Sequence, residues 1–123
     1  MSDVLLVDDD AAVRKMMRIA LEVAGLDVVA VGEARVALKH LRDGPPCLLV
    51  TDLFMPDMDG LELLAEAGRI APGMPVLVIS GGGRFHDVTP LATAEHMGAV
   101  STLAKPFSVD ELVTAVRAAL ANG

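Results

Sequence analysis

Four short runs of Val, Leu and Ile and a weaker fifth recur along this chain of 123 residues, and the first four contain no polar residue. The runs cover residues 4–7, 28–31, 48–50, 76–79 and, more weakly, 100–104. A strand without alternation between apolar and polar residues is covered on both faces, which is typical of parallel sheets flanked by helices. The pattern therefore predicts an α/β fold built on a parallel sheet.

Amphipathic segments at helical spacing separate these runs. The first begins after Asp10, a typical N-cap residue, and ends at Gly25, where a C-cap is expected. Its apolar stripe consists of Val13, Met16, Met17, Ala20, Leu21 and Ala24, and its polar face of Arg14, Lys15, Arg18 and Glu22. This segment is predicted to be a helix with one face on the sheet.

Four further helices are predicted along the chain. The second covers about residues 33–43, and the third begins near Gly60 and ends before Pro72. The fourth covers residues 89–98, and Ser108 with Glu111 forms a capping box that opens the fifth. Strand and helix thus alternate five times, which predicts one α/β domain over residues 1–123 with a doubly wound parallel sheet.

The composition excludes several classes of function. With 17 acidic and 10 basic side chains the formal net charge is −7, and aromatic residues make up 2%. No basic stripe is available for phosphates and no aromatic platform for bases, so we expect no nucleic-acid partner. No apolar run approaches the roughly 20 residues that span a bilayer. The first residues are acidic, unlike those of a signal peptide, so we expect a cytoplasmic protein without a membrane anchor.

The single cysteine and the three histidines offer no site of their own. Because Cys47 is the only cysteine, the chain can form neither an internal disulfide nor a zinc site of several thiolates. Cys47 is expected to be a small core residue. His40, His86 and His96 have no metal-ligand spacing and are expected on the surface.

Polar side chains follow four of the apolar runs. Asp8 and Asp9 follow the first run, Asp52 the third, Ser80 the fourth and Lys105 the fifth. In open parallel sheets ligands bind beyond the carboxyl ends of the strands, so these groups are expected to converge there. Carboxylates about 4 Å apart repel one another, and a bound cation relieves that repulsion. Oxygen ligands favour a hard cation such as Mg²⁺. A carboxylate beside Mg²⁺ and a lysine has the surroundings of a nucleophile in phosphoryl transfer.

At these residues the sequence resembles the receiver domain of two-component response regulators. The motifs that carry the resemblance, in the family's order, are LLVDDD at residues 5–10, TDLFMPDMDG at 51–60, VLVISG at 76–81 and KPF at 105–107. The resemblance covers essentially the whole chain. It implies a flavodoxin-like fold with five helices around a five-stranded parallel sheet of order 2-1-3-4-5.

The resemblance also implies a function for the acidic residues. Asp52 matches the phosphoacceptor, which takes a phosphoryl group from the phosphohistidine of a sensor histidine kinase or phosphotransfer protein. Asp9 and Asp52 match ligands of Mg²⁺, Asp8 assists largely through water, and the backbone carbonyl of Phe54 falls at the third protein ligand. The transfer and the later dephosphorylation are self-catalysed, so the chain is not expected to be an enzyme in any other sense.

The remaining matches concern switching. Lys105 matches the lysine that pairs with the phosphoryl oxygens, Ser80 the hydroxyl that moves toward them, and the peptide bond before Pro106 is cis in the family. Thr102 departs from the family, which usually has Tyr or Phe at this position. The change at Ser80 must therefore reach the outer face without a coupled change in an aromatic side chain. The face of the fourth helix, fifth strand and fifth helix is the expected surface for an unidentified output protein and for a homodimer.

Four other functions are compatible with parts of this sequence, and a calcium loop is a fifth. A pseudo-receiver that binds without phosphorylation and a phosphorelay shuttle without output both stay open. A flavin module of the same topology is disfavoured because Asp8 and Asp9 would repel its phosphate. An aspartyl phosphatase needs a second carboxylate two residues after the nucleophile, where Phe54 stands. A calcium loop at Asp57 is disfavoured because Pro56 lies inside it.

Overall fold

The computed structural model describes residues 2–52, 57–58, 60–80 and 100–121. They contain a five-stranded parallel sheet of order β2-β1-β3-β4-β5, which confirms the predicted fold. The strands are β1 (Val4–Val7), β2 (Val28–Val31), β3 (Leu48–Asp52), β4 (Val76–Ser80) and β5 (Val100–Ala104). The third and fourth strands run further than their apolar runs, so that Asp52 and Ser80 are themselves the last strand residues.

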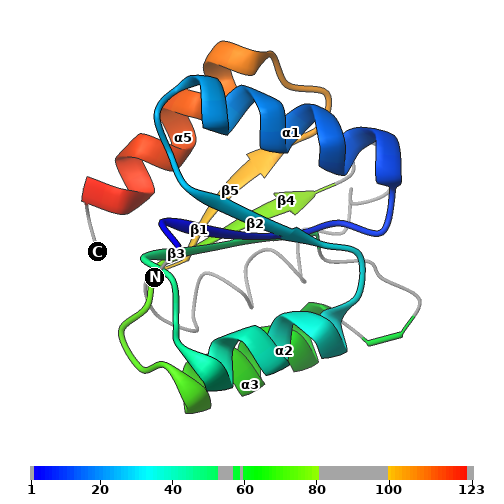
Figure 1. Cartoon of the computed structure of the whole chain (residues 1–123), viewed down its shortest axis with the longest axis vertical. Helices are drawn as coiled ribbons and strands as arrows, with labels where there is room; N and C mark the ends of the chain where they lie inside the picture. Colours follow the sequence, from blue (N-terminus) through cyan, green and yellow to red (C-terminus); the bar gives the residue numbers. More distant parts are fainter. Residues whose placement is uncertain (1, 53–56, 59, 81–99, 122–123) are drawn as a thin grey trace.

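Helices cover both faces of this sheet. The described helices are α1 (Ala11–Val23), α2 (Ala34–Asp43), α3 (Gly60–Ile70) and α5 (Val109–Ala121). Figure 1 shows α1 and α5 on one face and α2 and α3 on the other. The helix predicted over residues 89–98 lies outside the described residues. None of the helices in the described part of the chain is long and apolar enough to cross a membrane.

The strand side chains form two apolar layers, one on each face of the sheet. Leu5 and Val7 belong to the layer under α2 and α3, whereas Val4 and Leu6 belong to the layer under α1 and α5. All four side chains are at most 1% exposed. The absence of alternation in this part of the sequence thus has the predicted cause, because both faces of β1 are covered.

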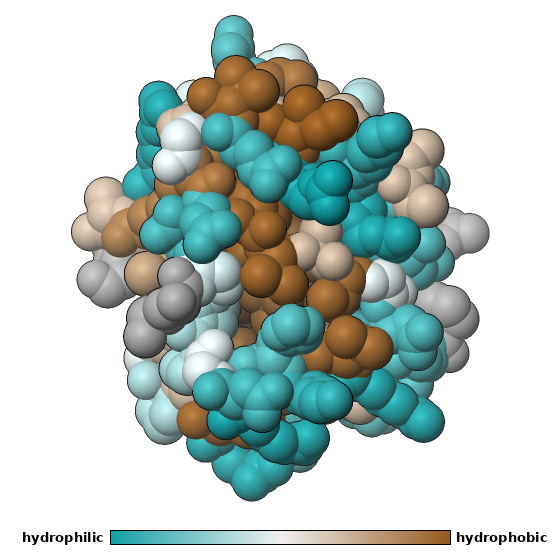
Figure 2. Space-filling view, viewed as in Figure 1, coloured by the Kyte–Doolittle hydropathy of each residue, from teal (hydrophilic) through white to brown (hydrophobic). Residues whose placement is uncertain are grey.

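The outer surface of α1 is more apolar than the sequence pattern suggests. Met16, assigned above to the buried stripe, is 39% exposed, and Ile19 and Val23 are 46% and 83% exposed. Met17 and Leu21 are the residues of this helix that are fully buried. Figure 2 shows apolar surface where α1 and β2 lie and mainly hydrophilic surface over α2. The buried stripe of α1 is therefore narrower than predicted.

The predicted helix ends are found at α1 and α5. The Asp10 carboxylate accepts hydrogen bonds from the amides of Ala12 and Val13, and Gly25 adopts a φ of 93° after the last turn of α1. At α5, the Ser108 and Glu111 side chains accept from each other's backbone amides, as a capping box requires. Local sequence therefore defines these ends.

Asp10→Ala is expected to lower the free energy of unfolding by about 1 kcal/mol, because two first-turn amides of α1 lose their acceptor. Chemical denaturation of the parent and the variant measures this change. Asp10→Ser, which retains an acceptor, is the matched control and should recover most of the loss. Equal stability of all three proteins would contradict the assigned cap.

Two surface residues complete the comparison with the sequence. Cys47 is exposed, so its assignment to the core was wrong. Cys47 directly precedes β3, whose first residue Leu48 is fully buried. The buried strand thus begins one residue after the cysteine. His40 is exposed as expected, whereas His86 and His96 lie outside the described residues.

Candidate functional site

Three carboxylates meet at the carboxyl edge of the sheet. Asp8 directly follows β1, and Asp52 ends the neighbouring strand β3. One carboxylate oxygen each from Asp8, Asp9 and Asp52 lies within 4.8 Å of the others. Asp8 is 0% exposed and Asp52 is 9% exposed, while Asp9 faces solvent. The parallel pairing of β1 and β3 thus produces the convergence that the sequence predicts.

Lys105 supplies the counter-charge. Its Nζ donates a hydrogen bond to Asp52 Oδ2 at 3.2 Å and lies 3.6 Å from Asp8 Oδ2. The lysine directly follows β5, and its peptide bond to Pro106 is cis, the form that the resemblance implies. Its side chain is 27% exposed. The Lys105 ammonium, at the end of β5, therefore lies close to two of the three carboxylates, those of Asp8 and Asp52.

The predicted switch residues lie nearby on the backbone. Ser80, the last residue of β4, pairs in register with Ala104, directly before Lys105. Thr102 is half-buried on β5 and pairs with Val78. The side chain of Ser80 and the whole of Phe54 lie outside the described part of the chain. The strand register therefore places the backbone of Ser80 beside the strand end that carries the lysine.

Burial and charge shift the pKa values of two groups in the site. Burial raises the pKa of Asp8, and the charges of Asp52 and Asp9 raise it further, against the opposing effects of the Asp10 amide and Lys105. Desolvation opposes the charged form of Lys105, but the attraction of Asp52 and Asp8 outweighs it and raises the lysine pKa. Asp8 is therefore costly to ionise, whereas Lys105 is held in its charged form.

One oxygen of the Asp8 carboxylate accepts no hydrogen bond from the described residues, although the Lys105 ammonium lies 3.6 Å from it. Among the described residues, Asp8 Oδ2 is a buried side-chain atom with no hydrogen-bond donor within range. A buried carboxylate oxygen without a donor is unfavourable, and two more carboxylates stand beside it. Carboxylate oxygens in this number, with one side open to water at Asp9, suit Mg²⁺. The donor set thus fits a hard divalent cation.

The backbone of Asp8 is fixed by its neighbours. Its amide donates to the carbonyl of Val31 at 3.2 Å, and its carbonyl accepts from the Arg14 guanidinium at 2.7 Å. Asp8 Oδ1 also accepts from the Asp10 amide at 2.9 Å. These contacts hold the aspartate at the strand end before any ligand arrives.

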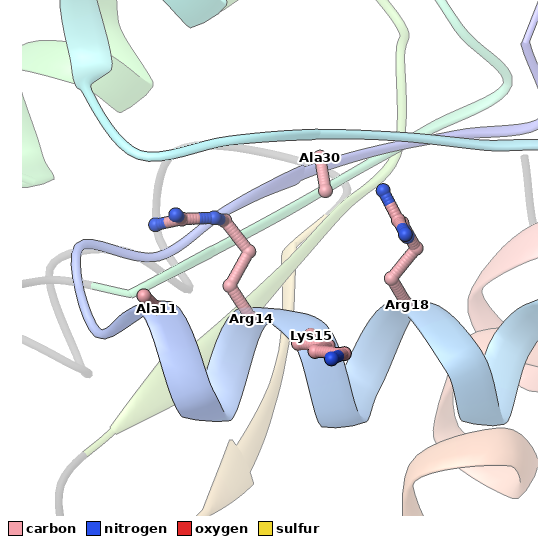
Figure 3. Close-up of a pocket in the computed structure, with 5 residues that line it drawn as sticks. All are labelled: Ala11, Arg14, Lys15, Arg18 and Ala30. Atoms are coloured by element: carbon pink, nitrogen blue, oxygen red, sulfur yellow. The ribbon is translucent and has the colours of Figure 1, made fainter.

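Arg14 is a site residue that the sequence pattern did not reveal, because its spacing placed it on the polar face of α1. Figure 3 shows Arg14 and Arg18 extending from α1 toward the strand that carries Ala30. A hollow of about 360 Å³ lies between them, lined by Ala11, Arg14, Lys15, Arg18 and Ala30. A Cβ at Gly32 would lie 2.8 Å from the Arg14 guanidinium, so the missing side chain at that glycine makes room for the arginine.

Asp57 is the second residue that the sequence pattern did not assign. Its Oδ1 and Oδ2 accept from the amides of Ala34 and Arg35, at 3.2 and 3.1 Å, in the first turn of α2. Glu33, at the N-cap position, makes no capping hydrogen bond of its own. Both oxygens of Asp57 are thus engaged with helix amides. The sequence signal was the lack of a capping residue before α2.

Comparison with known proteins places these features in a family. Residues 4–117 match the family model described as the response regulator receiver domain. The chain is 36% identical over 119 residues to the DNA-binding transcriptional regulator NtrC of Bradyrhizobium sp. (strain RP501 Parasponia), covering 97% of this chain and 24% of that protein. It is 38% identical over 120 residues to the C4-dicarboxylate transport transcriptional regulatory protein DctD of Pseudomonas aeruginosa, covering 97% and 25%. The chain thus spans about a quarter of the length of these relatives.

Solved structures give the same result. The receiver domain of NtrX from Brucella abortus superposes with a TM-score of 0.89 at 31% identity, covering 98% of this chain and 100% of that one. A CheY-like response regulator receiver domain protein from Methanospirillum hungatei superposes with a TM-score of 0.89 at 26% identity, covering 98% and 94%. Sequence and structure therefore lead to the same family.

Proposed function

Because this chain belongs to the response regulator receiver family of two-component signal transduction, we propose that Asp52 is its phosphoacceptor. The observation that carries the assignment is the convergence of Asp8, Asp9 and Asp52 within 4.8 Å, with Lys105 bonded to Asp52. An Asp52 oxygen would attack the phosphorus of a phosphohistidine. The P–N bond would then break, and its electron pair would stay with the imidazole nitrogen. The product is an acyl phosphate at Asp52.

Four groups of the chain would hold Mg²⁺ for this step. They are the carboxylates of Asp9 and Asp52, the Asp8 carboxylate acting largely through water, and the backbone carbonyl of Phe54. When bound, the cation balances negative charge on the transferred oxygens. Asp8 Oδ2 supports this assignment, because this buried oxygen accepts no hydrogen bond from the described residues and a bound cation would balance its charge.

The residues of β4 and β5 would read the phosphoryl group. Lys105 would shift its hydrogen bond from Asp52 to a phosphoryl oxygen. The hydroxyl group of Ser80 would donate a hydrogen bond to another phosphoryl oxygen. Because Thr102 lacks an aromatic ring, the change at Ser80 must reach the surface by another path than ring rotation. Coupling a local charge change to a loop that has two arrangements is the general form of such a switch.

The proposed partners follow from this chemistry. A sensor histidine kinase or phosphotransfer protein would supply the phosphoryl group, and an unidentified output protein would read it, in the cytoplasm. The face formed by residues 89–98, β5 and α5 would serve that output or a homodimer. Apart from self-catalysed transfer and dephosphorylation we propose no enzyme activity. Two alternatives are a pseudo-receiver and a phosphorelay shuttle without output. The phosphorylation test below separates the first from a receiver, and binding assays with output proteins separate the second.

Intact-mass spectrometry after incubation with acetyl phosphate tests the proposal. The parent is expected to gain one phosphoryl group when Mg²⁺ is present and to stay unmodified when it is removed by a chelator. Asp52→Asn should gain none under either condition. A parent that never forms the adduct would favour the pseudo-receiver, and an adduct on Asp52→Asn would overturn the site.

A further inference from the structure

The Arg14 side chain connects α1 to the peptide bond between two of the clustered aspartates. Its guanidinium donates a hydrogen bond of 2.7 Å to the backbone carbonyl of Asp8. The carbonyl of Asp8 and the amide of Asp9 lie in one rigid plane, so this bond fixes the plane from which Asp9 begins. A hydrogen bond with a charged donor is also stronger than one between neutral groups. Arg14 therefore contributes to the orientation of both aspartates.

Asp9 is the aspartate of this cluster that packing supports least. It is exposed, whereas Asp8 is 0% exposed and Asp52 is 9% exposed. One oxygen of the Asp9 carboxylate nevertheless lies within 4.8 Å of oxygens of the other two. Because little protein surrounds the Asp9 side chain, its position depends on the backbone that carries it. That backbone begins at the peptide bond that Arg14 holds.

Gly32 leaves the space in which the Arg14 guanidinium lies. A Cβ at this glycine would be 2.8 Å from Arg14 Nη1, and the next two nearest atoms outside its chain neighbours also belong to that guanidinium. Nη1 is the atom that bonds to the Asp8 carbonyl. The φ of Gly32 is not in the left-handed region, so its backbone accepts alanine. A methyl group at position 32 would therefore displace the end of a flexible side chain and leave the backbone in place.

We infer that Arg14 is a positioning residue for the Mg²⁺ site. Its bond to the Asp8 carbonyl, made in the space that Gly32 leaves, holds Asp8 and Asp9 in the arrangement that the cation needs. The inference rests on the proposed function. Charge alone would have the opposite effect, because the arginine is a cation near the site and its loss would tighten Mg²⁺ binding. The sign of the change in Mg²⁺ affinity thus separates positioning from electrostatics.

Mg²⁺ titration calorimetry on the full chain tests this role. Arg14→Met is expected to weaken Mg²⁺ binding by about 3- to 10-fold, somewhat below the usual effect of removing a group that bonds directly to a metal ligand. Arg18 lies one turn further along α1 and pairs with Glu22 instead. Arg18→Met removes the same charge and is the matched control, which should bind Mg²⁺ at least as tightly as the parent.

Gly32→Ala perturbs the same hydrogen bond while Arg14 is retained. The added methyl group should move the guanidinium away from the Asp8 carbonyl and weaken Mg²⁺ binding in the same direction. In Gly32→Ala/Arg14→Met the methyl group meets no guanidinium, so the double variant should bind Mg²⁺ as Arg14→Met alone does. Two substitutions that act on one contact are non-additive in this way, whereas independent effects multiply.

Thermal unfolding in chelator shows whether each variant is folded at the temperature of the titration. If Arg14→Met is unfolded, Gly32→Ala decides the question alone, and parent affinity in that variant would overturn the inference. Arg14→Met binding that equals or exceeds the parent's would overturn it as well, as would losses from the two single variants that multiply in the double variant. A parent that binds no Mg²⁺ would overturn the proposed function itself.

Discussion

Replacing Lys105 with Met is expected to slow phosphorylation by acetyl phosphate about 100-fold, the usual cost of losing one preorganised donor to a developing charge. In the structure the Lys105 ammonium is 3.2 Å from Asp52 and within ion-pair distance of Asp8. Its removal leaves the transferred oxygens without that donor. The rate is measured by intact-mass spectrometry at saturating Mg²⁺.

Mg²⁺ binding distinguishes this effect from damage to the site. Lys105 and Mg²⁺ would both neutralise the same carboxylates, so Lys105→Met should bind the cation at least as tightly as the parent. Lys39→Met, which removes the same charge from the exposed surface of α2, is the matched control and should react at the parent rate. A Lys105→Met rate within a factor of two of the parent would contradict the role of the lysine.

Asp8→Asn is expected to stabilise the metal-free protein while impairing its reaction. The Asp8 carboxylate is 0% exposed, and burial together with neighbouring carboxylates disfavours its charged form. A neutral amide removes that cost and can donate a hydrogen bond to one of the adjacent carboxylates. We expect a gain of about 1 kcal/mol, or a Tm rise of about 4 °C, and a loss of Mg²⁺-dependent phosphorylation. Asp43→Asn, at an exposed position, should change neither quantity.

The stability gain should depend on pH in a defined direction. Because the pKa of Asp8 is raised above its ordinary value of 3.8, the protonated carboxyl is favoured in the folded state. The resulting stabilisation is complete below that value and is lost as the pH rises through the folded pKa. The difference between Asp8→Asn and the parent should therefore shrink toward pH 3.8 and be largest near neutrality. Denaturation midpoints in chelator across this range measure it, and a difference that grows on acidification would contradict the assignment.

Much of the fold could be predicted because the decisive signals are local. Unbroken apolar runs identified strands with two covered faces, and Asp10, Ser108 and Glu111 mark helix ends through bonds to nearby amides. The acidic site could be predicted for a related reason. In a parallel sheet, the carboxyl ends of β1 and β3 meet wherever the helices pack, so Asp8 and Asp52 must converge.

The residues that the sequence did not reveal act across the fold. Arg14 has the spacing of a solvent-facing side chain, yet it bonds to the Asp8 carbonyl and occupies the space beside Gly32. Asp57 caps a helix that begins more than twenty residues before it. Cys47 differs in burial from Leu48, its neighbour on the chain. Such contacts depend on how elements pack, which periodicity along one segment does not encode.

The position of the phosphoryl group within the chain decides whether Asp52 is the phosphoacceptor. After reaction with acetyl phosphate, borohydride reduces an acyl phosphate of aspartate to homoserine, and peptide mass spectrometry identifies the altered residue. We expect homoserine at position 52 alone, in samples that contained Mg²⁺ and not in those treated with chelator. Modification at Asp8, Asp9 or any other residue, or modification of Asp52 that is equally fast without Mg²⁺, would contradict it.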